Sequence, residues 1–297
     1  MFVKAIENIQ QFTRPVHTII RQYHNHFIQP GAATLFFVND EGVAITCKHV
    51  LHVLIHEKQI NAHFENFKKE RSLLGSKNDG KYKIKLKALE TKYNYAQPES
   101  TAQLKNNVMS CFDKITFDYF PHPTLDLAIL KFKDFTNKYY SSHATFLKDS
   151  SQIKQGKTLC RFGFPFAEFT NYTYDTDTDE INFTATGNMS SPSFPIDGMV
   201  TRQVSADGKK IIGIELSTPG LKGQSGGPLF DAAGLVYGMQ SETTHFHLGF
   251  NEKKIEVITK GKKINVVNDT FFNAGRCVHV DCIKEFLVAH HVKFYEA

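Results

Sequence analysis

The sequence predicts a mainly β fold that ends in one α-helix. Residues 33–46 and residues 228–238 each hold two apolar runs of strand length joined by a short turn, so each segment is expected to form a hairpin. In contrast, apolar residues between 282 and 291 recur at helical spacing, and Asp281 before them is a good N-cap. These segments indicate antiparallel sheets followed by a closing helix.

Length and composition agree with a chain of one or two domains. Of its 297 residues, 41% are hydrophobic, and 26 Phe without any Trp predict a phenylalanine-rich core. The N-terminus lacks the apolar region of a signal peptide, and no stretch is long and apolar enough to cross a membrane. Five cysteines without a Cys-x-x-Cys pair argue against a disulfide framework. We therefore expect a cytoplasmic protein with reduced thiols and no membrane partner.

The most informative motif is Gly223-Gln224-Ser225-Gly226-Gly227-Pro228. Glycines beside a serine allow a tight turn whose amides can face a developing oxyanion. The pattern Gly-x-Ser-x-Gly also fits the nucleophile elbow of α/β-hydrolases, but that elbow requires a helix after the serine, and a hairpin is expected here. For the motif taken alone, a plain loop between strands remains the alternative.

Two other segments carry residues that would activate such a serine. His49 follows the strand expected at 43–46, and Asp126 opens an apolar run of strand length. A serine needs a neighbouring imidazole to take its proton, and the imidazole needs a carboxylate to fix its tautomer. A carboxylate at the start of a buried strand costs free energy unless it accepts a hydrogen bond, and a histidine N–H is a natural donor.

Neither of two metal-binding patterns is complete. His52 and His56 follow His49 at helical spacing, but no Cys or Glu completes a zinc-ligand pattern. Residues 171–193 contain four acidic residues, yet they lack the glycine and the distal glutamate of an EF-hand loop. We expect no metal, and we expect 171–193 to be an exposed loop that gates the cleft.

In the order His, Asp, Ser, the three segments resemble the chymotrypsin-fold serine peptidases, in their HtrA-like or trypsin-like peptidase branch. The motif Thr46-x-x-His49-Val50 is the one that carries the general base in this family, and the motif Asp126-x-Ala-x-Leu is the one that carries its aspartate. The sequence Gly-Phe-Pro at 163–165 is similar to the turn that opens the second barrel. The resemblance implies an all-β fold of two six-stranded antiparallel Greek-key β-barrels with a C-terminal α-helix.

The resemblance also implies how the chain is divided. The expected units are an N-terminal leader at 1–30, a first β-barrel at 31–150 with a basic insertion at about 61–95, a second β-barrel at 151–280 and a C-terminal helix at 281–297.

Roles follow from the same resemblance. His49 would be the general base, Asp126 would orient it, and Ser225 would be the nucleophile. The main-chain amides of Gly223 and Ser225 would form the oxyanion hole. Secreted trypsins carry an aspartate directly before the serine, whereas this chain carries Gln224, so no zymogen switch of that kind is expected.

The insertion is rich in lysine. Residues 61–92 contain nine Lys/Arg and four Asp/Glu residues, and lysines alternate with apolar residues over 81–88. This alternation predicts a half-buried strand with a solvated basic face. Nucleic-acid binding is the less favoured alternative, because aromatic residues are not interleaved on the basic face.

The resemblance locates a substrate pocket before the serine and on the strand after it. The position six residues before Ser225 holds a proline rather than an acid, which favours cleavage after apolar residues. Glu242 would oppose this preference if its carboxylate entered the pocket from the strand after the serine. The expected pocket residues are Pro219, Gly220, Leu221, Met239, Gln240 and Ser241.

The sequence therefore predicts a trypsin-like serine endopeptidase that acts on a peptide or protein substrate without a cofactor. A catalytically silent peptide-binding or scaffold protein on the same fold is the alternative. A regulatory partner or an oligomer would have to supply any control of activity.

Overall fold

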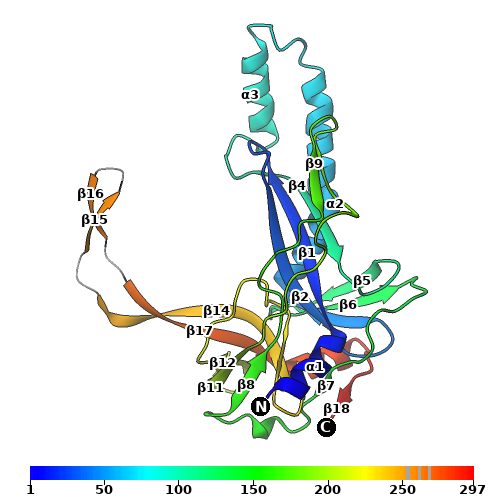
Figure 1. Ribbon diagram of the computed structural model, residues 1–297, viewed down its shortest axis with the longest axis vertical. Coiled ribbons are helices and arrows are strands. Elements are labelled where there is room, and N and C mark those ends of the chain that lie inside the picture. Colours follow the sequence, from blue (N-terminus) through cyan, green and yellow to red (C-terminus); the bar gives the residue numbers. More distant parts are fainter. Residues whose placement is uncertain (252–254, 260–261, 267–268) are drawn as a thin grey trace.

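Two β units carry most of the chain in the computed structural model (Figure 1). A pair of helices projects from one unit, and a long β ribbon projects from the other. The structure describes all residues except 252–254, 260–261 and 267–268. No helix among the described residues is long and apolar enough to span a membrane.

The first unit is a six-stranded antiparallel sheet with the strand order β4-β1-β2-β3-β6-β5. Its two edge strands, β4 and β5, do not pair with each other in the described part of the chain, so the sheet is a half-barrel. The bounds are β1 Thr13–Gln22, β2 Ile28–Phe37, β3 Val43–Thr46, β4 Thr101–Val108, β5 Thr116–Pro121 and β6 Ala128–Lys133.

The second unit is a closed barrel. Its strands follow the order β13-β8-β11-β12-β17-β14, and the pairing of β13 with β14 closes the ring. The bounds are β8 Thr158–Arg161, β11 Ile196–Ser205, β12 Ile211–Leu216, β13 Pro228–Phe230, β14 Val236–Asn251 and β17 Asp269–His279. Two short strands, β7 Thr145–Phe146 and β18 Tyr295–Glu296, extend the sheet beyond β14. A 3-10 turn, η1 Ser150–Gln152, precedes β8, and β15 Ile255–Thr259 pairs with β16 Lys262–Val266 at the end of the ribbon.

The predicted β fold with its C-terminal helix is confirmed, with two adjustments. The closing helix, α4 Val280–Ala289, begins one residue before Asp281, and His279 rather than Asp281 is its N-cap, accepting from the Asp281 main-chain N–H. Strand β1 lies inside the first sheet, between β4 and β2. The first sheet therefore starts at Thr13 rather than at residue 31, and only α1 Val3–Phe12 precedes it.

The strand predicted at 81–88 is wrong, because this segment is helical. Helix α2 Lys48–Ser72 and helix α3 Tyr82–Lys92 form the projecting pair (Figure 1). The lysine alternation ends at Lys87, whereas the less exposed Tyr82, Leu86, Leu89 and Tyr93 continue at helical spacing. Leu89 and Tyr93 belong to a small apolar cluster with two phenylalanines of α2. Packing of this face decides between the two patterns.

The acidic loop at 171–193 contains a hairpin of β9 Tyr172–Asp175 and β10 Glu180–Phe183. The Asp179 carboxylate is bound by cations of the protein itself, 2.7 Å from the Arg21 guanidinium and 2.9 Å from that of Arg71. The Tyr174 hydroxyl also donates to it at 2.9 Å. These contacts tie the hairpin to β1 and α2.

The core is rich in phenylalanine, as the composition predicts. Among the described residues, nine of the largest fully buried side chains are phenylalanines: Phe12, Phe36, Phe37, Phe64, Phe67, Phe146, Phe162, Phe169 and Phe230.

A buried histidine makes the stability of the fold depend on pH. The His17 ring is fully buried, stacks on Phe169 and shares a 2.9 Å hydrogen bond between Nε2 and the Ser191 hydroxyl. Burial lowers the pKa of His17 to about 4. The folded state therefore resists a proton that the unfolded chain binds at about pH 6.5, so stability present above that pH is lost as the pH falls toward 4.

We expect His17→Gln to remove part of this dependence, because glutamine does not titrate. Between pH 7 and pH 4.5, wild type should lose about 2 kcal/mol more unfolding free energy than the variant. Urea unfolding at the two pH values measures the difference. Equal losses in both proteins would show that His17 does not carry the effect.

Candidate active site

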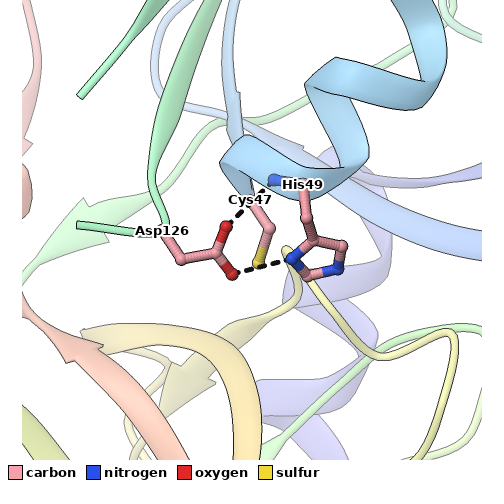
Figure 2. Close-up of side chains that lie close together, drawn as sticks. All are labelled: Cys47, His49 and Asp126. Atoms are coloured by element: carbon pink, nitrogen blue, oxygen red, sulfur yellow. Dashed lines mark hydrogen bonds and ion pairs between the residues drawn. The ribbon is translucent and has the colours of Figure 1, made fainter. Parts of the chain in front are cut away.

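His49 and Asp126 are joined by two hydrogen bonds (Figure 2). The imidazole Nδ1 lies 2.8 Å from Asp126 Oδ2, and the His49 main-chain N–H donates to Asp126 Oδ1 at 3.0 Å. Strand pairing explains the contact, because Thr46 at the end of β3 lies opposite Ala128 at the start of β6. His49, the second residue of α2, therefore meets Asp126, which lies two residues before β6.

These bonds fix both the charge of the aspartate and the tautomer of the histidine. Burial opposes ionisation of Asp126, but hydrogen bonds from the His49 ring and main chain outweigh it and lower the pKa of the carboxyl. An ionised carboxylate accepts from Nδ1–H. In the neutral ring, Nε2 is then the nitrogen without a proton, and it is available as a base.

Cys47 lies behind this pair (Figure 2), and its Sγ, a ring nitrogen of His49 and an Asp126 oxygen are all within 4.8 Å of one another. The donor set does not suit a metal. Burial, followed by the nearby Asp126 charge, raises the pKa of the Cys47 thiol, and the thiol donates to the Gln240 carbonyl at 3.2 Å. A metal ligand would have to be the thiolate. Nδ1 is also already bonded to the carboxylate.

Ser225 sits in a turn that requires glycine on both sides. Gly223 has φ +101° and Gly226 has φ +87°. A Cβ on Gly223 would lie 2.5 Å from the Phe164 carbonyl oxygen, and one on Gly226 would lie 2.0 Å from that of Thr34. Both the backbone angle and the available space therefore exclude a side chain at these positions.

Thr34 on β2 of the first sheet holds this turn. Its N–H donates to the Ser225 carbonyl at 2.9 Å, and its hydroxyl donates to the Gly223 carbonyl at 2.8 Å. The same hydroxyl accepts from the Phe164 N–H at 3.2 Å, and the Thr34 carbonyl accepts from the Thr46 hydroxyl at 2.7 Å. Thr46 ends β3, directly before the segment that carries the base. The serine turn of the second unit is thus fixed against the first unit.

The amides expected to form the oxyanion hole are free to donate. In the described part of the chain, neither the Gly223 N–H nor the Ser225 N–H donates a hydrogen bond, whereas the N–H groups of Gln224, Gly226 and Gly227 all do. The buried Gln224 side chain stabilises the turn, accepting from the main chain at 3.0 Å and donating to it at 2.9 Å.

The predicted contact between Ser225 and His49 is not formed as a hydrogen bond. Among the described residues, no hydrogen bond joins the Ser225 hydroxyl to His49. Such contacts are often long in the absence of substrate. The structure thus holds the His49–Asp126 pair and the serine turn in place through separate bonds.

A cavity of about 340 Å³ opens beside Ser225. Five of the six expected pocket residues line it, and Met239 does not. The Met239 side chain is fully buried in the barrel core, whereas Gln240 next to it reaches the cavity. Gln240, Ser241, Glu242 and Thr243 all line the cavity, and the pairing of β14 with β17 shifts register between Gln240 and Glu242. Four further residues line the cavity that the sequence did not predict: Lys222, Thr243, His245 and Asn273. Asn273 lies on β17, and only the pairing of β14 with β17 places it at the cavity.

Gly226→Ala should cause a large loss of stability, because its side chain would meet the Thr34 carbonyl as well as straining the backbone. The matched control is Gly208→Ala, because Gly208 has φ +77° but a Cβ there would have no atom within 4 Å. The control should lose about 1–2 kcal/mol from backbone strain alone. Gly226→Ala should lose clearly more in chemical denaturation. Equal losses would show that the approach of Thr34 does not matter.

The chain matches a known protein family over most of its length. The trypsin-like peptidase domain matches residues 33–239. No curated protein matches the sequence. Among solved structures, a variant of the HtrA-type protease AlgW with a tripeptide is similar at 13% identity and a TM-score of 0.46, over 97% of this chain and 63% of that chain. AlgW with a decapeptide is similar at 13% identity and a TM-score of 0.48, over 97% of this chain and 67% of that chain. Because the family match covers the segments of His49, Asp126 and Ser225, the chain belongs to the trypsin-like peptidase domain family.

Proposed function

We propose that this protein is a serine endopeptidase with the triad His49, Asp126 and Ser225. One observation carries the proposal: a histidine bonded to an ionised aspartate lies on the same unit that holds the serine turn through Thr34. The family match supports hydrolysis of peptide bonds as the reaction class.

In the proposed mechanism, His49 Nε2 takes the Ser225 hydroxyl proton as Oγ attacks the scissile carbonyl carbon. The carbonyl oxygen becomes an oxyanion, which the Gly223 and Ser225 N–H groups stabilise. The imidazolium then protonates the leaving amine, and an acyl-serine remains. Water, deprotonated by His49, attacks this ester, and the imidazolium returns the proton to Ser225 Oγ as the acyl C–Oγ bond breaks and the acid is released. Asp126 stays ionised and stabilises the imidazolium throughout.

We propose a peptide or protein as the substrate, lying along β14 beside the cavity. The match to a peptidase domain supports this choice. The reaction needs no cofactor. Because Gln224 already bonds the turn on both sides, we propose that no proteolytic activation is needed to form it.

A catalytically silent peptide-binding protein is the second candidate. The observation that favours it is that the Ser225 hydroxyl makes no hydrogen bond to His49 among the described residues. The two candidates differ in whether Ser225 reacts with an electrophile.

We also propose a reducing, cytoplasmic environment. All five cysteines are free and buried, which supports this location.

Ser225→Ala should abolish both peptide cleavage and covalent labelling by a fluorophosphonate probe, because the nucleophile is gone. The fold should persist, since the Ser225 main-chain bonds do not depend on the hydroxyl. Intact-mass measurement of the adduct, with circular dichroism as the folding control, reads out both. Labelling of the variant at the wild-type rate would exclude Ser225, and an unlabelled wild type would favour the silent candidate.

A further inference from the structure

A buried arginine without an acidic partner lies behind the substrate cavity. Arg161 is 0% exposed. Its guanidinium donates to Gln240 Oε1 at 3.0 Å and to the Thr218 carbonyl at 3.0 Å. No Asp or Glu of the described residues forms an ion pair with it. Burial lowers the pKa of Arg161, but a guanidinium remains charged at physiological pH.

The guanidinium lies against the residues that form the cavity wall. Thr218, which it contacts, directly precedes the lining residues Pro219 and Gly220. On the other side, a Cβ on Gly275 would lie 1.9 Å from the arginine nitrogen, so only glycine allows this approach. The Arg161 Nε is buried and has no hydrogen-bond partner. Among the described residues, the positive charge therefore has no ion-pair partner next to the cavity.

Arg161 also fixes the orientation of the Gln240 amide. A guanidinium only donates hydrogen bonds, so it must face the amide oxygen of Gln240, and the NH₂ group must face away. This NH₂ donates once, to the Glu242 carbonyl at 2.8 Å. It also lies against Gly220, where a Cβ would be 2.2 Å from Nε2. Gln240 is a lining residue of the cavity, so its amide lies in the cavity wall with a positive charge behind it.

The other charges at the cavity do not cancel this field. Glu242 is the one acid among the lining residues, and its carboxylate pairs with Arg276 at 3.0 Å. Lys222 adds a further cation to the lining. Asp197, the acid that attracts Arg161, is exposed and makes no ion pair with it.

From these contacts we propose, building on the peptidase function above, that the cavity binds an acidic side chain of the substrate and that cleavage follows glutamate. A carboxylate accepts from the Gln240 N–H and lies in the field of Arg161. An apolar side chain leaves that donor unpaired, and a lysine or arginine side chain adds a second positive charge. The acidic preference replaces the apolar preference expected from Pro219.

Peptidyl phosphonate probes that differ only in the P1 side chain test this preference. They react with Ser225 in a single step, so their rates compare side chains directly. With the full-length protein, the probe with P1 Glu should react at least tenfold faster than those with P1 Gln or P1 Leu. Faster reaction of the Leu probe would overturn the proposal.

Gln240→Glu tests the assigned residues. The glutamate keeps an oxygen for Arg161 but places a negative charge at the cavity wall. The rate of the P1 Glu probe relative to that of the P1 Leu probe should therefore fall at least tenfold. The matched control is Gln203→Glu, which adds the same charge on β11, where Gln203 donates to the Ile153 carbonyl. Its ratio should match wild type. An unchanged ratio in Gln240→Glu would overturn the role of this pair.

A fluorophosphonate probe without a peptide separates the two proposals. If it labels Ser225 while the Glu preference is absent, the acidic pocket is wrong and the peptidase function stands. If it fails to label wild type, the peptidase function fails, and the pocket proposal fails with it.

Discussion

The site depends on the hydrogen bonds of one buried residue, Thr34. Its N–H and hydroxyl bond across the contact between the two β units, to the serine turn and to the segment at Phe164, whereas its carbonyl accepts from Thr46 within the first unit. Thr34 is 0% exposed, so water cannot replace these partners without opening the contact. The nucleophile and its base come from different units, and Thr34 sets the distance between them.

The base, His49, lies in the first turn of α2, and hydrogen bonds hold this helix against β4. Asn61 on α2 exchanges two hydrogen bonds with the Leu104 main chain on β4, at 2.7 and 3.0 Å. Glu57 accepts from the Asn106 N–H at 3.0 Å. The helical pair that projects from the first unit is therefore continuous with the element that carries His49.

The sequence was sufficient for the parts of the site that depend on local chemistry. The glycines around Ser225, the strand before His49 and the hairpin after Pro228 all follow from short-range patterns, and the structure has the expected hairpins. The lysine alternation failed as a predictor, because packing of Leu89 and Tyr93 against α2 decides the conformation there.

Contacts between distant segments could not be predicted from the sequence. Nothing in the sequence around Thr34 shows that its hydroxyl reaches Gly223, and nothing around Arg161 shows that it meets Gln240. Met239 was misplaced for the same reason, since which side chains of β14 enter the core depends on the barrel's registers. Long-range register, rather than residue type, determines these features.

Fluorophosphonate labelling of Thr34→Val and Thr34→Ser tests most directly whether Thr34 positions the nucleophile. Valine keeps the shape but removes the hydroxyl that bonds Gly223 and Phe164, whereas serine retains it. With both variants folded, labelling of the valine variant should slow at least tenfold, and the serine variant should react at a rate close to wild type. Equal labelling rates in all three proteins would contradict the claim that Thr34 positions the nucleophile.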